Sequence, residues 1–336
     1  MATPFLATSP GGYNPTQIRH AYGFDQISGN GAGQTIAIVD AYGNPNVVND
    51  LTVFSSTYGL PAASISVYYP KGKPSVTNSG WALETNLDVQ WAHAIAPGAK
   101  IAVVVAKSAS LSDLLGAVDY AVKTVGAKQV SMSWGGSEFS SEASYDSHFN
   151  KTGVSFFASS GDNGAGVMWP ACVPYVVAVG GTTLQLDSAG NIISETAWSG
   201  SGGGVSAYEA KPSWQGSWQS TTKRTVPDVS YNADPYTGFP VYITNYNGST
   251  GWIMVGGTSA GAPQWAAQQA LVNAARTTSL SNTASAAYSI AGSNYAADFR
   301  DITSGSNGYA AGAGYDYVTG LGSPKSAALV PALIAK

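Results

Sequence analysis

The chain has 336 residues, 44% of them hydrophobic, which is enough for a substantial core in one large domain or two smaller ones. Its net charge is −4 and it contains no basic cluster, so nucleic acid is not an expected partner. The longest apolar run, IAVVVA from Ile101, is too short to cross a bilayer, and the N-terminus lacks the basic start and apolar stretch of a signal peptide.

Charged residues make up 10% of the chain, against about 25% in an average soluble protein, and 40 glycines with many small polar residues take their place. Acid unfolds proteins largely by protonating carboxylates that are paired in the native state, so a chain with few ion pairs has less to lose as the pH falls. Compositional drift would explain the same numbers. The single cysteine, Cys172, excludes an internal disulfide and is interpreted as a small buried hydrophobe.

From residue 34 onwards, short apolar strands alternate with helical segments. This order is typical of a doubly wound α/β fold with a mainly parallel sheet and helices on both faces. The predicted strands are 34–40, 99–106, 127–136, 154–164 and 174–183, and the predicted helices are 47–59, 79–98, 111–126, 142–150 and 259–276.

Residues 199–251 differ from this pattern, because they are rich in Gly, Trp, Tyr and turn residues that favour loops and hairpins. No repeat, low-complexity tract or linker divides the chain, so a single domain is expected. Sheets of this kind carry their sites beyond the carboxyl ends of the strands. Asp40, Trp134, Asp162 and the loop before Ser259 all fall at such positions.

The stretch GGTSAGAPQW places Ser259 at the predicted start of a helix, where a hydroxyl can serve as a nucleophile. Such a serine needs a base, and the chain has three histidines. On the helix 79–98, Glu84 and Asp88 lie four residues apart and therefore about 40° from each other on one face. His93 lies about 900° of rotation and about 13 Å beyond Glu84, so it projects from the opposite side.

Four large apolar residues surround the two acids on this helix: Trp81, Leu83, Leu87 and Trp91. Two carboxyl groups in such surroundings are expected to share a proton, which raises the apparent pKa of the pair. A solvated acidic stripe is the common alternative for acids at this spacing, and the apolar neighbours weaken that interpretation without excluding it.

Asp162 lies in SSGDNGAG, a glycine-flanked turn that follows a predicted strand. An aspartate here can cap the turn. If its carboxyl group is held protonated, it can instead donate a hydrogen bond to a developing oxyanion. The local sequence leaves both interpretations open.

Several segments, taken in order, resemble the sedolisins, the serine-carboxyl peptidases, and in particular their kumamolisin-type bacterial members. The resemblance runs from Tyr13 to LGSPKSAALV. The segments are ETNLDVQWAHAIAPGAKI, SWGGSE, ASSGDNGAG, YVVAVGGTT, SGGGVS, VPDVSYNADPYTG, GGTSAGAP and DITSGSNGYAAGAGYDYVTGLGSP. Each motif alone is weak, but eight in this order are highly specific.

This resemblance implies a subtilisin-like fold in which the helix that carries the catalytic histidine in subtilisins carries a glutamate. Ser259 would be the nucleophile of an endopeptidase that works through an acyl-enzyme. Glu84 would be the general base and then acid, and Asp88 would orient it and share its proton. Asp162 would be the protonated oxyanion donor, so the working pH would be acidic. The chain has GGTS where many relatives have SGTS, a difference expected to matter little.

The resemblance also implies binding residues. The strand end SMSWGG would pair with an extended peptide backbone as an added strand; the substrate-binding residues would be Ser133, Trp134, Gly135 and Gly136. Region 298–324 would hold one structural Ca²⁺ through an all-oxygen set suited to a hard cation. The ligands would be Asp301 and Asp316 through carboxylates and Ile302, Gly312 and Gly314 through carbonyls.

Residues 1–336 would thus form a single peptidase domain, with 1–12 as an N-terminal arm. A secreted monomer that acts on polypeptides is expected, with no membrane partner and with endopeptidase rather than tripeptidyl-peptidase activity. Family members are made with a long prodomain, so a prodomain inhibitor is expected in the precursor, although no prodomain precedes Tyr13 here.

Three alternative interpretations exist. A histidine-dependent subtilisin would use Asp40, a histidine and Ser259, but His93 faces the wrong way and His20 precedes the fold. An inactive homologue would act as a secreted calcium-dependent peptide-binding module, against which the complete catalytic set argues. A structural surface protein would explain the Gly, Ser and Tyr content and leave the ordered motifs unexplained.

Overall fold

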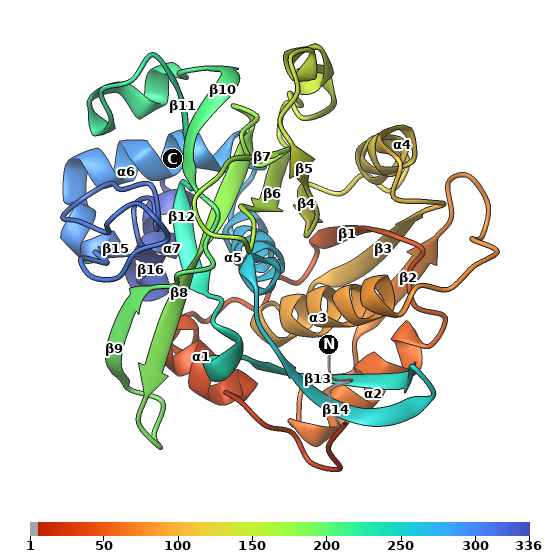
Figure 1. Ribbon diagram of the computed structural model, residues 1–336. Coiled ribbons are helices and arrows are strands. Elements are labelled where there is room, and N and C mark those ends of the chain that lie inside the picture. Colours follow the sequence, from red (N-terminus) through yellow and green to blue (C-terminus); the bar gives the residue numbers. More distant parts are fainter. Residues whose placement is uncertain (1–5) are drawn as a thin grey trace.

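A central sheet organises the chain, and the computed structural model describes it over residues 6–336 (Figure 1). Seven of its strands are parallel and follow the order β12-β8-β6-β4-β1-β3-β2, and β9 runs antiparallel along β8. The strands are β1 (Thr35–Ala41), β2 (Ser64–Tyr68), β3 (Lys100–Ala106), β4 (Gln129–Met132), β6 (Ser155–Ser159), β8 (Val176–Leu186), β9 (Ile192–Ala197) and β12 (Val229–Asn232).

Helices cover both faces of this sheet (Figure 1). Successive side chains of a strand point to opposite faces. In β1, Ile36 and Ile38 therefore join the core beneath α3 (Ser79–Ile95) and α5 (Gly261–Ala274). Val39, the next residue along the strand, points the other way and joins the core beneath α4 (Leu111–Lys123). These two cores confirm the predicted mainly parallel α/β architecture with helices on both faces.

Smaller elements surround the sheet. Within residues 6–336, no helix is both long and apolar enough to span a membrane. The remaining helices are α1 (Pro15–Ala21), α2 (Val47–Thr57), α6 (Thr283–Asp298) and α7 (Ser326–Ile334). The short antiparallel pairs are β5 (Gly136–Ser137) with β7 (Met168–Trp169), β10 (Gly204–Ala210) with β11 (Lys223–Val226), β13 (Phe239–Tyr246) with β14 (Ser249–Val255), and β15 (Phe299–Arg300) with β16 (Ser323–Pro324).

The helix α3 is the central helix of the molecule. Its N-cap is Asn78, whose side-chain oxygen accepts a hydrogen bond from the backbone N–H of Trp81 at 3.1 Å, and the helix ends two residues before Pro97. Every residue from Thr85 to Ile95 is buried. A helix buried all round places any acidic side chain it carries out of water.

The structure differs from the sequence predictions in three places. Residues 142–150 were expected to form an α-helix, and they form the 3₁₀ helix η2 (Glu142–His148). Residues 199–251 contain the predicted hairpins, but also β12, a strand of the central sheet. Helices α1, α6 and α7 and strand β2 were not predicted. β12 has only four residues and owes its conformation to hydrogen bonds with β8, about fifty residues away, which no local pattern reveals.

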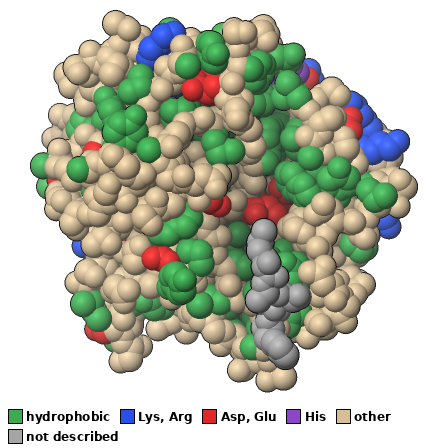
Figure 2. All heavy atoms as spheres, viewed as in Figure 1, with side chains coloured by type: hydrophobic (Ala, Val, Ile, Leu, Met, Phe, Trp, Pro, Cys, Tyr) green, Lys and Arg blue, Asp and Glu red, His purple; other side chains and the backbone are tan. Residues whose placement is uncertain are grey.

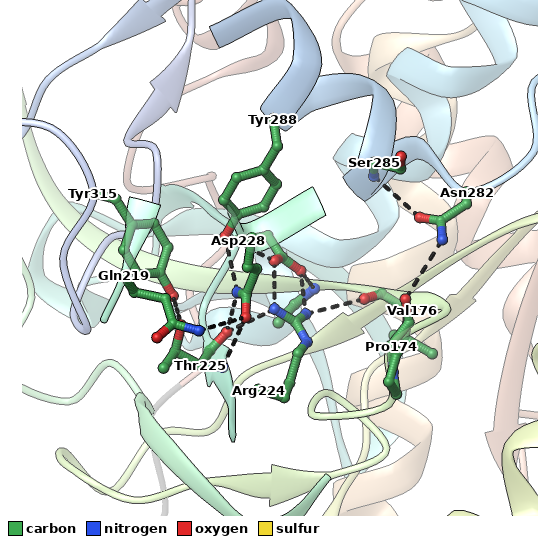
Figure 3. Close-up of polar contacts among 12 residues, drawn as sticks. Pro174, Val176, Gln219, Arg224, Thr225, Asp228, Asn282, Ser285, Tyr288 and Tyr315 are labelled. Atoms are coloured by element: carbon green, nitrogen blue, oxygen red, sulfur yellow. Dashed lines mark hydrogen bonds and ion pairs between the residues drawn. The ribbon is translucent and has the colours of Figure 1, made fainter. Parts of the chain in front are cut away.

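A buried ion pair ties β11 to β12 (Figure 3). Arg224 donates from both terminal nitrogens to the Asp228 carboxylate, at 2.7 and 2.6 Å, and neither side chain is exposed. Asp228 also accepts from the Tyr288 hydroxyl at 3.1 Å and from the backbone N–H of Ala178 at 2.8 Å. The Arg224 guanidinium lies 4.8 Å from the ring centroid of Trp214.

Candidate active site

Ser259 lies in a short 3₁₀ turn, η5 (Thr258–Ala260), that leads directly into α5. It is 9% exposed. The preceding residue, Gly257, has φ +109°, and a Cβ atom there would lie 2.6 Å from Oδ2 of Asp162. Glycine is therefore required at this position both by the backbone conformation and by the close approach of the aspartate.

The helix α3 brings two carboxyl groups to Ser259. The Ser259 hydroxyl lies beside the Glu84 carboxyl group and favours its charged form, and Asp88 lies beside Glu84, one helical turn further on. Two adjacent carboxyl groups can share a hydrogen bond only if one of them holds a proton. The structure thus brings Ser259, the partly buried Glu84 and the fully buried Asp88 together.

Asp40 completes this arrangement. It lies near the carboxyl end of β1, is fully buried, and its charge acts on both Glu84 and Asp88. The sequence suggests Asp40 only for a histidine-dependent triad, so Asp40 is absent from the predicted catalytic set. The sequence feature that points to Asp40 as a site residue is its position at the end of the first predicted strand. We call Asp40, Glu84 and Asp88 the carboxyl cluster.

The pKa values of the carboxyl cluster are all raised, with burial as the largest cause. Burial raises the pKa of Asp40 to about 7. Burial and the charge of Asp40 raise the pKa of Glu84 to about 8, although the Ser259 hydroxyl opposes the shift, and they raise the pKa of Asp88 well above its usual range. Within residues 6–336, no lysine, arginine or histidine forms an ion pair with any of the three.

Few neutral donors compensate these acids. Both oxygens of Asp40 and of Asp88, and Oε1 of Glu84, are buried without a donor among the described residues. Ser133 lies beside Asp88, but a hydroxyl has one proton, and Ser133 Oγ directs it to the carbonyl oxygen of Ser259 at 3.2 Å. Protons are therefore the means by which the cluster limits its charge.

The three histidines of the chain lie away from this cluster. His20 pairs with Asp25 and contacts Asn191. His93 is buried on α3, where its Nε2 lies 2.9 Å from the carbonyl oxygen of Pro61, and His148 lies 3.2 Å from Asp119. None of these partners belongs to the carboxyl cluster. His93 projects away from Ser259, as the helical spacing predicted.

Asp162 lies on the other side of Ser259, in the loop after β6. It is exposed, and its Oδ1 accepts hydrogen bonds from the backbone N–H and the hydroxyl of Thr258 at 2.7 and 2.8 Å. The Thr258 hydroxyl also accepts from the backbone N–H of Gly161 at 3.1 Å. These contacts fix the Asp162 carboxyl group against the backbone that carries Ser259. Its Oδ2 has no donor in this set and stays available for a ligand.

The predicted substrate edge forms one wall of the same site. Gly135 and Gly136 are exposed, and Gly136 pairs with Trp169 of β7 through one backbone edge. Trp134 is buried, and its Nε1 donates to the carbonyl oxygen of Val39 at 2.8 Å. Figure 2 shows acidic side chains near the centre of this face and Lys and Arg mainly towards its rim.

Two hollows adjoin this edge. One, of about 450 Å³, is lined by Glu84 and by Asn78, Gly80, Trp81, Ser133, Trp134 and Gly135. The other, of about 250 Å³, is lined mainly by apolar side chains: Trp81, Ala109, Leu111, Leu114, Trp134, Phe139 and Trp169, together with Gly135, Gly136 and Ser137. A narrow glycine edge between a carboxyl-lined and an apolar hollow is suited to an extended peptide with side chains on both sides.

In the predicted calcium region, two aspartates accept hydrogen bonds from the backbone of the short segment 312–314. Both oxygens of Asp301 accept from the backbone N–H of Gly314 at 3.1 Å, and Oδ2 of Asp316 accepts from that of Gly312 at 3.0 Å. Ile302 is buried beside them. Within residues 6–336, neither carboxylate pairs with a cationic side chain. The donor set is all oxygen and carries two negative charges, which fits Ca²⁺.

Comparisons with known proteins place the chain among its relatives. The subtilase family model matches residues 29–307. Kumamolisin from Bacillus sp. (strain MN-32) is 35% identical over 98% of this chain, and sedolisin from Pseudomonas sp. (strain 101) is 32% identical over 96%. The chain spans 65% and 61% of the length of these two proteins.

A solved structure agrees with these matches. It is that of Pseudomonas sedolisin, described as a serine-carboxyl proteinase, in complex with two molecules of pseudo-iodotyrostatin. The chain superposes on it with a TM-score of 0.85 and 31% identity, covering 96% of this chain and 98% of that one. The chain therefore belongs to the subtilase family and, within it, to the sedolisins.

Proposed function

We propose that this protein is an acid-acting serine-carboxyl endopeptidase that hydrolyses peptide bonds through an acyl-enzyme on Ser259. One observation carries the proposal: the hydroxyl of Ser259 lies beside Glu84 of a carboxyl cluster that forms no ion pair with a cationic side chain, and all three histidines lie elsewhere. A carboxylate whose pKa is raised towards neutrality is a competent general base for a serine.

In acylation, the Oγ atom of Ser259 attacks the peptide carbonyl carbon while the Glu84 carboxylate accepts the hydroxyl proton. Glu84 then returns this proton to the leaving amine as the C–N bond breaks. In deacylation, Glu84 takes a proton from water, whose oxygen attacks the ester carbonyl, and returns it to Ser259 Oγ. The proton balance closes over one cycle.

The other carboxyl groups have supporting roles. Asp88 shares a proton with Glu84 and orients it, and Asp40 acts on both through its charge. Asp162, in its protonated form, donates a hydrogen bond to the oxyanion that develops on the substrate carbonyl. Because this donor needs a proton, the proposal places activity at acidic pH, and it requires that the pKa of Glu84 in the substrate complex falls below its raised value in the free chain.

The substrate is a polypeptide, bound as an extended strand along Gly135 and Gly136. Support comes from the exposed glycine edge and the two hollows beside it. Region 298–324 holds one Ca²⁺ through Asp301, Asp316 and backbone carbonyls, and the ion fixes this loop without entering the chemistry. A secreted monomer, inhibited by a prodomain in its precursor, completes the proposal.

Hydrolysis of an unfolded protein across about pH 2 to 8 tests the function. The parent is expected to be active at acidic pH, and both Ser259→Ala and Glu84→Gln are expected to be inactive. Activity in neither parent nor variants would favour a peptide-binding module, and loss in Ser259→Ala alone would remove Glu84 from the mechanism. Mass spectrometry of the products separates internal cleavage from release of tripeptides.

A further inference from the structure

A second group of ionisable side chains lies outside the active site, where η2, β10 and the loop after β7 meet. The donor atoms of Glu138, Glu142 and Cys172 all lie within 4.8 Å of one another. Glu142 and Cys172 are fully buried, and the Cys172 thiol donates to Oε1 of Glu142 at 3.4 Å. Glu138 and Glu142 lie four residues apart in one segment and Cys172 in another, and the fold brings the two segments to one place.

A third carboxyl group, on β10, lies near this group of residues. Glu209 is 3% exposed, and its Oε1 is buried without a hydrogen-bond donor among the described residues. Burial, and after it the charges of Asp146, Glu142 and Glu138, raise the pKa of Glu209 to about 7. Glu209 therefore lies within the range of these charges. A buried carboxylate oxygen without a partner is costly, and a bound cation would satisfy it.

Hydrogen bonds orient the other carboxylates. Glu138 accepts from the Ser206 hydroxyl and from the backbone N–H of Ala207, the latter at 3.1 Å. Oε2 of Glu142 accepts from the backbone N–H of Phe139 at 2.8 Å. These contacts leave Oε1 of Glu142 directed at the thiol. Second contacts that fix a ligand's orientation are typical of metal sites.

Cationic side chains do not compensate this charge. Among residues 6–336, no lysine, arginine or histidine forms an ion pair with Glu138, Glu142, Asp146 or Glu209. Arg224 attracts Glu209, but it is the smallest of the influences on that group and is already engaged by Asp228.

We propose that Glu138, Glu142, Glu209 and Cys172 form a binding site for one divalent cation of the zinc class. Zinc binds thiolate sulfur and carboxylate oxygen together, usually with four tetrahedral ligands. Bonds of about 2.0 to 2.3 Å place such ligands about 3.3 to 3.8 Å apart, so the donor atoms of Glu138, Glu142 and Cys172 need to close by roughly 1 Å. Glu209 lies outside this group of three and has to move towards it to become the fourth ligand. On binding, the S–H bond of Cys172 breaks, the S–metal bond forms, and the proton is released to the buffer.

The ion would connect the substrate edge to β10. Glu138 directly follows β5, and the backbone N–H of Cys172 is bonded to the carbonyl oxygen of Met168 in β7. Partly exposed Glu138 and Asp146 give the ion a route from solvent. Neither Ser259 nor the carboxyl cluster takes part in this site. Metal binding can therefore be tested independently of the proposed peptidase activity.

The sole cysteine provides a specific signal for the test. The chelator-treated full chain is titrated with Cd²⁺ alone at about pH 7.5, and thiolate-to-metal charge transfer is followed in the ultraviolet. We expect a band that saturates at one Cd²⁺ per chain and is displaced by Zn²⁺. Ser259→Ala is expected to give the same band, which also removes self-digestion from the measurement.

Variants locate the ligands. Cys172→Ser is expected to abolish the band, and Glu142→Gln and Glu209→Gln to weaken Cd²⁺ binding at least about tenfold. Asp301→Asn, in the proposed calcium region, is the matched control and is expected to leave the titration unchanged. Absence of the band in the folded parent at saturating Cd²⁺, or parental affinity in Glu209→Gln, overturns the proposal.

Discussion

The Arg224–Asp228 pair and the carboxyl cluster of Asp40, Glu84 and Asp88 are both removed from water, but only the first contains a cation. Burial alone would lower the pKa of Arg224, and the adjacent Asp228 carboxylate more than offsets this and raises it above its ordinary value. In the carboxyl cluster, burial and mutual repulsion raise the pKa values of all three acids.

This difference separates a structural site from a reactive one. The ion pair joins a charge to its counter-charge, so it can hold β11, β12 and the Tyr288 hydroxyl in place (Figure 3). The carboxyl cluster changes its proton number within the range in which proteins work. A group that gains and loses a proton easily is what acid–base catalysis needs.

The largest expected effect breaks the cluster. Glu84→Gln keeps the shape of the side chain but cannot accept the Ser259 proton, so kcat is expected to fall about 10³- to 10⁴-fold, or roughly 4 to 5.5 kcal/mol. Initial rates at the optimal pH measure this. Glu195→Gln, at a buried glutamate bonded to Tyr22 and Ser323, is the control and should keep kcat. Parental kcat in Glu84→Gln would contradict the proposed base.

The next effect breaks the ion pair. Asp228→Asn leaves the Arg224 guanidinium buried without its counter-charge and is expected to lower the free energy of unfolding by about 3 to 5 kcal/mol. Urea denaturation at neutral pH measures the loss. Asp88→Asn, which removes a buried acid that has no cation, is expected to cost no stability there. An equal loss in both variants would erase the distinction between the two sites.

Removal of the proposed Ca²⁺ tests a region joined to the ion pair. An ion present at about a hundred times its Kd adds about 2.7 kcal/mol to the free energy of unfolding. Chelation is expected to remove a contribution of this size and therefore to lower Tm. Differential scanning calorimetry with and without chelator measures it. Asp316→Asn should be less stable than the parent and insensitive to chelator. If chelation leaves Tm unchanged, Ca²⁺ does not occupy this region.

The pH dependence of stability sharpens the comparison. The folded pKa values of Asp40 and Glu84, about 7 and about 8, exceed their ordinary values of 3.8 and 4.5. The folded chain therefore holds protons that the unfolded chain releases. These extra protons stabilise the folded chain, and their contribution is complete below about pH 4. It is lost as the pH rises to about 8, and the free energy of unfolding falls by about 1.4 kcal/mol per pH unit for each extra proton.

Urea denaturation at several pH values checks this slope. Asp40→Asn should flatten it, because the substitution removes one of the retained protons and weakens the repulsion that acts on the other two acids. Tyr288→Phe removes a hydroxyl that bonds Asp228 and Gln215 and no member of the carboxyl cluster, so it should leave the slope as it is. A parent whose stability rises over this range would contradict the proton-holding cluster.

The smallest effect concerns the link between the ion pair and the calcium region. The Tyr315 hydroxyl donates to Oγ1 of Thr225 at 2.7 Å. Thr225 directly follows Arg224 of the ion pair, and Tyr315 directly precedes Asp316 of the calcium region. Tyr315→Phe removes this bond and is expected to cost about 0.5 to 1.5 kcal/mol in the free energy of unfolding, measured by urea denaturation. A cost above this range would mean that the link also holds the loop together.

Much of the fold and of the candidate site could be predicted from the sequence, because the patterns that indicate them lie within single helices and strands. Glu84 and Asp88 could be placed on one face because helical geometry fixes residues four apart, and the same geometry excluded His93. The alternating apolar segments predicted the parallel sheet. Asp40 was missed as a member of the cluster, because its contact with Glu84 joins β1 to α3 across more than forty residues of chain.

The sequence by itself determined five parallel strands of the sheet (β1, β3, β4, β6 and β8), the helix that carries the two acids and the serine just before α5. Each of these follows from side-chain spacing within one element. Only the tertiary structure decided which buried charges would meet. Arg224 and Asp228 lie four apart without a helix between them, and Glu142, Cys172 and Glu209 come from distant segments. Such encounters depend on long-range packing, and the resulting burial sets which groups keep their charge and which exchange protons.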